Sequence, residues 1–551
     1  MENQQQTSSR IARSTAVVAL AFATAKAISL LQTFIIARTF GVGYEYDAFV
    51  TANRAPELIV TLIAGGSLGF AFIPIFSGLL GQGKREDAWE VASHVINTVF
   101  LAALILSALT FAIAPWLVGV VYAPGFPPDI QLQTVTLLRI LLISTLVFSV
   151  SGIIQGILQS HNHFLSPALA PIMFDLGILF GVVYLIPTLG IYGIAWGAVL
   201  GACLHFLVQV PALFHFGARW KLAFGFRSAR LWLVVRLMLP RIAGLGVFYF
   251  NFTLMNNLAS RLGEGSVSAL SWGWQLTQIP QTLLGTALGI VVFPTLASLS
   301  ESGKADVKQT TLNGILKFML IATIPAMVGL ILIGQPLISL LEGGAFDSSA
   351  TDLVYASLRA FALSIVVMSI LEIMARSFYA DKDTLTPLWA ALVGAAVNFV
   401  LAIYLSGFQL QIDWLALRFT LSPHPTPLVN LGVAGLGLAL SLGILLEITL
   451  LILILRRRWQ WSVWNELGST FVRVMLASVL MGAVVWLVNL VWEQMGLANQ
   501  GRLLTLVQIS VLGVVGVLSY VLWSWIFRIR EIFDFMRMLL QQRGQGMKNV
   551  N

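Results

Sequence analysis

Charged residues are scarce in this chain. Asp, Glu, Lys and Arg make up 10% of its 551 residues, whereas hydrophobic residues make up 58%. A soluble protein of this length could not bury that much apolar surface. Runs of around twenty apolar residues recur along the sequence, and each predicts a helix that spans a membrane. The composition therefore predicts an all-α integral membrane protein with about fourteen transmembrane helices.

The sequence also lacks the patterns expected of an enzyme or a redox protein. The single cysteine, Cys203, excludes an intrachain disulfide, and the six histidines form no ligand pair on a helix. No GxxxxGK[ST] loop is present to hold ATP, and no loop clusters Asp residues as a metal-dependent glycosyltransferase does. We therefore expect neither an enzyme nor a bound cofactor or metal. Coupling to Na⁺, H⁺ or the membrane potential stays open.

The positive charge is distributed over short loops. The net charge is +8, and basic loops such as those at Lys84, Lys304 and Arg456 alternate with loops nearly free of Lys and Arg. Basic loops stay on the cytoplasmic side of a membrane. This pattern predicts cytoplasmic termini at both ends and membrane lipids, rather than nucleic acid, as partners.

One stretch occurs twice. The residues from Gly66 to Lys84 return from Thr286 to Lys304, and the same register aligns Phe126 with Phe346 without a gap. The copies are six predicted spans apart, an even number, so both cross the membrane in the same direction. The sequence predicts a parallel repeat of two six-helix lobes, followed by two extra carboxy-terminal helices. These two helices either form a groove for a lipid tail or cover the second lobe.

This repeat sets the expected division of the chain. We predict an N-lobe at 1–216, an amphipathic linker on the membrane surface at 217–232 and a C-lobe at 233–458. The two extra helices follow at 459–528, and a basic cytoplasmic tail at 529–551. An insertion at 407–430 distinguishes the second copy from the first.

Polar side chains inside the predicted spans are the candidate site residues, because a charge at the bilayer centre costs about 2.5–3.5 kcal/mol. The candidates for binding a substrate are Lys26, Gln32, Arg38, Asp47, Arg54, Glu57, Arg241 and Gln275.

Several of these residues have more than one interpretation. Lys26 is near the middle of its span, where it could pair with a carboxylate or hold an anionic substrate. Arg38 and Asp47 are near the external end, where charges can reach water at low cost. Arg54 and Glu57 are three residues apart and could pair on one helix face.

Other ionisable residues in the spans have simpler interpretations. Glu372 and Arg376 are four residues apart and are expected to neutralise each other. Asp175, His205 and Glu447 are isolated, and each could bind a coupling ion.

The motifs resemble those of the bacterial MurJ/MviN lipid II flippases. The resemblance rests on ARTFGVGYEYDAF (37–49), the helix with Pro56, AFIPIF (71–76), APGF (123–126) and FYADKDTLTP (378–387), and it covers nearly the whole chain. It implies the fold of the multidrug/oligosaccharidyl-lipid/polysaccharide exporters in the bacterial plasma (inner) membrane. The implied cargo is lipid II, the undecaprenyl-pyrophosphate-linked precursor of peptidoglycan, and the cell-wall synthesis machinery is an implied partner.

The chain departs from this family in its cavity. Where the family has arginines, this sequence has Lys26, Gln32, Val60 and Gln275. Several cations hold a pyrophosphate best, so either Arg38, Arg54 and Arg241 share the binding or the chain moves another lipid-linked glycan or glycolipid. A non-transporting scaffold for envelope assembly and an integral-membrane glycosyltransferase are the remaining alternatives.

Overall fold

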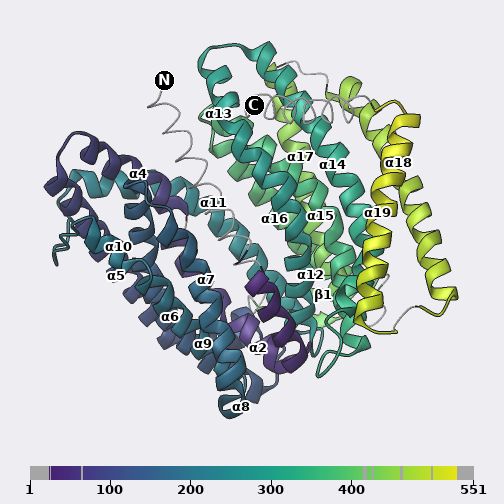
Figure 1. Ribbon diagram of the computed structural model, residues 1–551, viewed down its shortest axis with the longest axis horizontal. Helices are drawn as coiled ribbons and strands as arrows, with labels where there is room; N and C mark the ends of the chain where they lie inside the picture. The colour runs from purple at the N-terminus through teal and green to yellow at the C-terminus, as the bar shows by residue number, and fades with distance from the viewer. Residues whose placement is uncertain are drawn as a thin grey trace, which may run out of the picture. The chain divides into compact units, whose positions relative to one another are not determined.

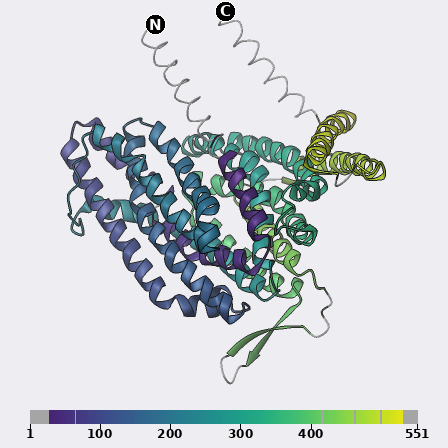
Figure 2. The ribbon, with the colours of Figure 1, turned by 60° about the horizontal axis from the view of Figure 1, so that its bottom comes forward.

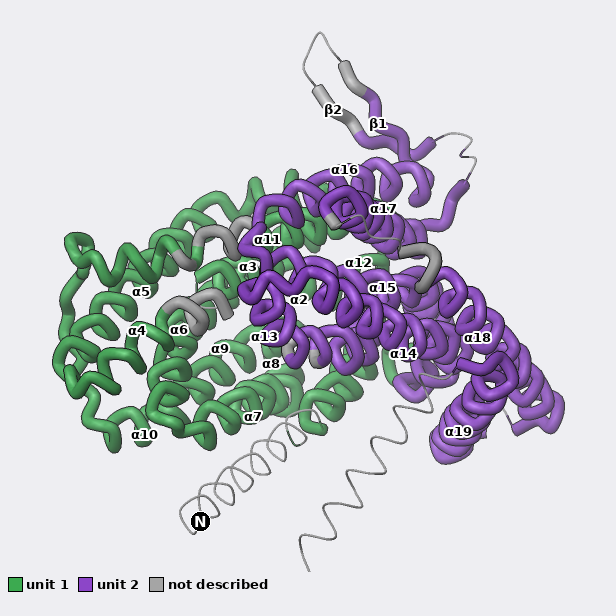
Figure 3. The backbone as a smooth tube through the Cα atoms, turned by 90° about the horizontal axis from the view of Figure 1, so that it is seen from above, with its two compact units in different colours: residues 1–268, 343–346 green, residues 269–342, 347–551 purple. Residues whose placement is uncertain are grey.

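A computed structural model describes residues 24, 27–63, 66–413, 418–424, 427, 429–459, 463–497 and 500–529. Lys26 and the predicted tail from residue 530 onward lie outside these residues. The chain divides into two compact units: residues 1–268 with 343–346 form unit 1, and residues 269–342 with 347–551 form unit 2 (Figure 3). Each unit is described by itself below.

Unit 1 consists of helices. After a helix at Ala27–Phe40, its α-helices are α2 (Tyr44–Ala52), α3 (Arg54–Ile63), α4 (Gly66–Gly81), α5 (Arg85–Trp116), α6 (Pro128–Ser160), α7 (Leu165–Phe180), α8 (Ile186–Leu189), α9 (Tyr192–Leu207), α10 (Val210–His215) and α11 (Ala229–Ser260). Two π-helical turns, η1 (Leu117–Tyr122) and η2 (Gly181–Leu185), extend α5 and α7. Helix α6 is central, because α2, α3, α4, α5 and α9 all pack against it (Figure 1).

Unit 2 is also mainly helical. Helix α12 (Ser266–Gln281) starts within the residues of unit 1, and the elements after it are η3 (Thr282–Thr286), α13 (Ala287–Glu301), α14 (Ala305–Ser339), α15 (Ser348–Ala380), α16 (Leu385–Leu405), β1 (Phe408–Asp413), β2 (Arg418–Pro423), α17 (Val433–Trp459), α18 (Val463–Gln494) and α19 (Arg502–Ile526). Helix α15 packs against α14 and α17, while α18 and α19 pack together and against α14 (Figure 1).

In the described part of the chain, eleven helices are long and apolar enough to cross a membrane. The all-α membrane fold predicted from composition is confirmed, whereas the count of fourteen stays a prediction. The second predicted span, 47–80, is divided among α2, α3 and α4. Its first break is at Asn53, and Pro56 lies in the first turn of α3, where a missing N–H group is tolerated.

The internal repeat is visible in the helix bounds. Helix α15 begins and ends 220 residues after α6, the distance from Pro128 to Ser348. Asn162 and Lys382 occupy equivalent turns and have positive φ values of 57° and 60°. Phe126 and Phe346 are both buried. The two copies of the sequence therefore form the same local structures.

Glycines allow α7 and α9 to pack closely in unit 1. A Cβ atom on Gly177 would lie 2.2 Å from the Cα atom of Gly201, and one on Gly197 would lie 2.8 Å from the Cα atom of Gly181. Small residues let helix backbones approach in this way when no hydrophobic effect drives helices together in lipid.

Two segments differ from the simple all-α expectation. The insertion at 407–430 contains an antiparallel hairpin in which β1 pairs with β2 and Phe408 lies opposite Pro423; Figure 2 shows the hairpin extending away from the helices of unit 2. The predicted linker 217–232 is not one helix, since residues 218–225 have no regular secondary structure and α11 begins at Ala229.

Candidate functional site

A polar cluster lies between α3 and α11 of unit 1, at Arg54. The Arg54 Nε atom donates a hydrogen bond to Asn256 Oδ1 at 3.4 Å, and its guanidinium lies 5.7 Å from the centre of the Phe252 ring. Asn256 is completely buried and donates through Nδ2 to Thr51 Oγ1 and to the backbone oxygen of Tyr122. Helix α11 therefore fixes the position of the arginine.

The second part of this cluster is one helical turn away, at Glu57. The Tyr249 hydroxyl lies 3.5 Å from Glu57 Oε1 and 2.9 Å from Thr61 Oγ1. Arg54 and Glu57 form no direct ion pair among the described residues, so the pairing considered from their spacing is not found. Each bonds instead to α11, about 190–200 residues later in the chain. Charge and hydrogen-bond donors thus face one another inside the predicted membrane region.

Asp47 is held in a different environment. Its side chain is completely buried. Oδ2 accepts a hydrogen bond from Gly265 N at 2.8 Å, and Oδ1 accepts from Ser268 N at 2.6 Å and from the Ser268 hydroxyl. The first N–H groups of a helix have no partner within that helix, so Asp47 completes the amino terminus of α12. Both carboxylate oxygens are used by the protein itself.

Arg38 lies near a loop that returns to unit 1 from later in the chain. Its guanidinium stacks on Phe34 at 4.4 Å, and its backbone oxygen accepts a hydrogen bond from Ala345 N at 2.8 Å. The adjacent Gly344 has φ +64°, and a Cβ atom there would lie 2.2 Å from the Arg38 oxygen. Gly344 is therefore required for this close approach.

The remaining candidates are less defined. Gln32 has a buried Oε1 atom for which the described residues supply no hydrogen-bond donor. Gln275 is exposed on α12 and donates to Ser271 Oγ at 3.3 Å. Arg241 lies in α11, but its side chain, like Lys26, is outside what the structure describes.

Two interpretations of other ionisable residues can be compared with the structure. Arg376 Nε donates to Glu372 Oε1 at 3.0 Å, which confirms that these residues neutralise each other. His205 Nδ1 lies 2.7 Å from Ser151 Oγ, which also accepts from Gln209. This histidine is thus part of a buried hydrogen-bond network between α6 and α9.

Sequence reasoning did not identify the neutral residues of this polar cluster, Asn256, Tyr249 and Thr61. A motif of fixed spacing could not reveal them, because they come from distant positions. Their polarity within apolar segments was the only available signal. Among the described residues, no three His, Cys, Asp or Glu side chains are grouped to hold a metal ion.

Comparison with solved structures defines the class of fold. An inward-facing multidrug resistance MATE family transporter of the MOP superfamily aligns with a TM-score of 0.63 and 15% identity, over 79% of this chain and 94% of that one. A lipid II flippase MurJ in an inward closed conformation aligns with a TM-score of 0.73 and 24% identity, over 94% of this chain and 100% of that one. The chain therefore has the fold that these two solved structures share.

Sequence comparison identifies the family. The family model described as lipid II flippase MurJ matches residues 36–505. The lipid II flippase MurJ of Burkholderia cenocepacia is 30% identical over 373 residues, which cover 66% of this chain and 72% of that protein. The probable lipid II flippase MurJ of Thermotoga maritima is 24% identical over 523 residues, or 92% and 95% of the two chains. The chain belongs to the MurJ family, a family of transporters, and the resemblance drawn from its motifs is confirmed.

Proposed function

We propose that this protein flips lipid II from the cytoplasmic to the outer leaflet of the bacterial inner membrane by alternating access. The family match over residues 36–505 carries this proposal. The head group of the cargo would cross through a polar chamber while its polyprenyl tail stays in lipid. Both termini would be cytoplasmic, and cell-wall enzymes that use lipid II would be its partners.

The Arg54 cluster supplies chemistry suited to a pyrophosphate. Its guanidinium is positioned by Asn256 and Phe252, while the Tyr249 hydroxyl adds a donor one turn away. An arginine can donate two parallel hydrogen bonds to phosphate oxygens. We propose Arg54 as the principal cation of unit 1 for the cargo, with Lys26, Arg38 and Arg241 as further cations.

The membrane potential would favour this direction of transport. One elementary charge that crosses 100 mV gains about 2.3 kcal/mol, and a pyrophosphate is anionic. Export from an inside-negative cell is therefore favoured. Coupling to Na⁺ or H⁺ is a separate proposal.

Another lipid-linked glycan is the second candidate cargo. Gln32 and Gln275 are neutral where the family resemblance implies arginines. A chamber with fewer cations should prefer a pyrophosphate-linked cargo less strongly over other cargoes, since charge-assisted hydrogen bonds contribute most to pyrophosphate binding.

Transport by the purified protein in vesicles tests both the cargo and the role of Arg54. Vesicles would contain fluorescent lipid II or, separately, the same polyprenol joined to another glycan. We expect wild-type protein to move lipid II, and Arg54→Gln to slow transport by about tenfold or more, since a hydrogen bond to a charged group contributes about 1.5–3 kcal/mol.

Arg139→Gln is the matched control. Arg139 belongs to the same unit and also stacks on a phenylalanine, Phe111, at 4.5 Å, but it donates to a backbone oxygen of α5. Its substitution should leave the transport rate unchanged. Equal losses of transport rate in Arg54→Gln and Arg139→Gln would exclude Arg54 from the proposed site. If the protein moved only the polyprenol joined to another glycan, that glycan would replace lipid II as the proposed cargo.

A further inference from the structure

A segment before α11 is attached along α5 by hydrogen bonds to its backbone. Asn97 Nδ2 donates to the backbone oxygens of Lys221 and Ala223, both at 2.8 Å, and Ser93 Oγ accepts from Lys221 N at 3.1 Å. Asn97 Oδ1 also accepts from the Trp220 indole at 2.9 Å. Two polar side chains one turn apart on α5 thus hold a segment that has no regular secondary structure.

Between Leu222 and Phe226, the exposed side chains of this segment are apolar. The exposed fractions of Leu222, Phe224 and Phe226 are 74%, 45% and 53%, whereas Ala223 is partly buried and Gly225 is buried. A segment that faced water would show the reverse alternation. Exposed aromatic residues together with basic ones are typical of the interface between a membrane and the cytoplasm.

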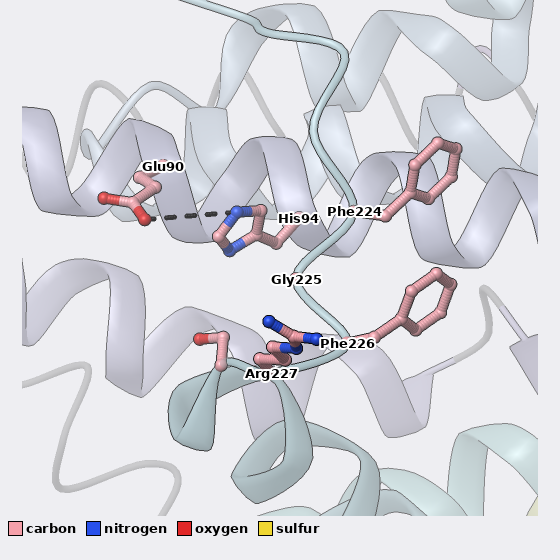
Figure 4. Close-up of a pocket in the computed structure, with 7 residues that line it drawn as sticks. Glu90, His94, Phe224, Gly225, Phe226 and Arg227 are labelled. Atoms are coloured by element: carbon pink, nitrogen blue, oxygen red, sulfur yellow. Dashed lines mark ion pairs between the residues drawn. The ribbon is translucent and has the colours of Figure 1, made fainter.

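A pocket of about 510 Å³ opens between this segment and α5, and we call it the linker pocket. Its lining residues are Glu90, His94, Phe224, Gly225, Phe226, Arg227 and Ser228 (Figure 4). Gly225 lets the segment approach α5 closely at the pocket, because a Cβ atom at this position would lie 2.5 Å from the His94 ring. The rings of Phe224 and Phe226 are parallel, with centres 5.7 Å apart.

The linker pocket carries charges of both signs. Glu90 is exposed, and its only ion pair among the described residues is a long one, 4.0 Å from Glu90 Oε1 to His94 Nε2. Arg227 is exposed and has no ion pair in the described part of the chain. The nearby Arg219 and Arg230 differ, because they pair with Glu86 and Asp87. One carboxylate and one guanidinium therefore remain available, beside an apolar rim.

We propose that the linker pocket binds the head group of phosphatidylethanolamine. The phosphate would accept hydrogen bonds from the Arg227 guanidinium and the Ser228 hydroxyl, and the primary ammonium would donate to the Glu90 carboxylate. The first carbons of the acyl chains would lie against Phe224 and Phe226. In the orientation proposed above, this lipid belongs to the cytoplasmic leaflet, and it is distinct from the transported cargo.

The charge pattern predicts selectivity among phospholipids. Phosphatidylglycerol has the phosphate but no ammonium for Glu90. Phosphatidylcholine has a quaternary ammonium that cannot donate a hydrogen bond. A purely basic surface would instead prefer the anionic phosphatidylglycerol.

Native mass spectrometry of the full chain in detergent can measure this selectivity. The protein would be mixed with equal amounts of the three phospholipids, all with the same acyl chains, and the retained lipids counted. We expect phosphatidylethanolamine to be retained most. Arg227→Gln should weaken its binding by about tenfold, as expected for a hydrogen bond to a charged group, and Glu90→Gln should remove the preference over phosphatidylglycerol.

Lys221→Gln is the matched control, because Lys221 is an exposed cation on the same segment that does not line the pocket. It should leave retention unchanged. Equal retention of the three lipids, a preference for phosphatidylglycerol, or equal effects of Arg227→Gln and Lys221→Gln would overturn the proposal. Arg227 and Glu90 are both exposed, so both variants should fold, which a thermal melt checks. Lipid II transport is measured in a separate experiment, so a failure of the phospholipid-binding proposal can be distinguished from a failure of the proposed transport function.

Discussion

Replacement of Asp47 by Ala should destabilise the protein severely. The substitution removes the only described acceptors for Gly265 N, Ser268 N and the Ser268 hydroxyl. A buried donor without a partner costs about 1–3 kcal/mol. Two backbone donors alone therefore predict a loss of about 2–6 kcal/mol, and Asp47→Asn should lose less because one oxygen acceptor remains.

Thermal unfolding followed by tryptophan fluorescence in detergent measures this effect. Glu45→Gln is the control, because Glu45 is exposed on the same short helix. We expect the melting temperature to fall clearly for Asp47→Ala, less for Asp47→Asn and not for Glu45→Gln. If Asp47→Ala melted at the wild-type temperature but lost transport, the reasoning would be refuted, and Asp47 would act on the substrate instead of on α12.

Two further predictions concern packing and pH. Gly177→Ala should lower the melting temperature, since overpacking costs about 1–3 kcal/mol. Gly329→Ala is the control and should not lower it, because no atom lies within 4 Å of a Cβ added there. Similar melting temperatures of the two variants would contradict close packing of α7 against α9. For Asp383, burial raises the carboxyl pKa, but hydrogen bonds from Thr386 and pairing with Arg458 outweigh it and lower the pKa. Its stabilisation is complete above the usual pKa of about 3.9 and is lost as the pH falls through the lower folded-state pKa. The melting temperature of Asp383→Asn should therefore depend less on pH in this acidic range than that of the wild-type protein. Parallel pH profiles of the two melting temperatures would exclude a pH-dependent stabilisation by Asp383.

The sequence was sufficient for the fold because apolar periodicity and an ungapped repeat are both local signals. The bounds of α6 and α15 follow the predicted offset of the two copies. The hairpin was not predicted, although the alternation in Gln409–Ile412 and Arg418–Leu421 is a signal for strands. The insertion was instead interpreted as an external loop between two transmembrane helices.

The candidate site was only partly accessible from sequence. Spacing suggested that Arg54 pairs with Glu57, but tertiary contacts with Asn256 and Tyr249 take precedence. Asp47 was selected because it is a charged residue in a predicted span, and its partners 218 and 221 residues away explain the burial that the structure shows. Partners at such separations depend on how the helices pack, which no local pattern specifies.

The two repeats also differ in a way that the alignment did not reveal. In unit 2, Lys308 is buried and donates to Ser377 O at 3.0 Å and to Asp381. At the equivalent turn of unit 1, His161 replaces the aspartate and stacks on Phe216, with ring centres 4.7 Å apart. The same backbone turn is thus stabilised by charge in one copy and by ring packing in the other.

The most direct test of the account is made in cells whose own lipid II flippase can be depleted. The amount of lipid II in the outer leaflet would be measured after depletion, with this chain, its Arg54→Gln variant or neither expressed. The account predicts that the wild-type chain restores outer-leaflet lipid II and growth, and that Arg54→Gln restores much less. A wild-type chain that is present in the membrane at normal levels, yet leaves lipid II in the inner leaflet, would contradict the proposed function.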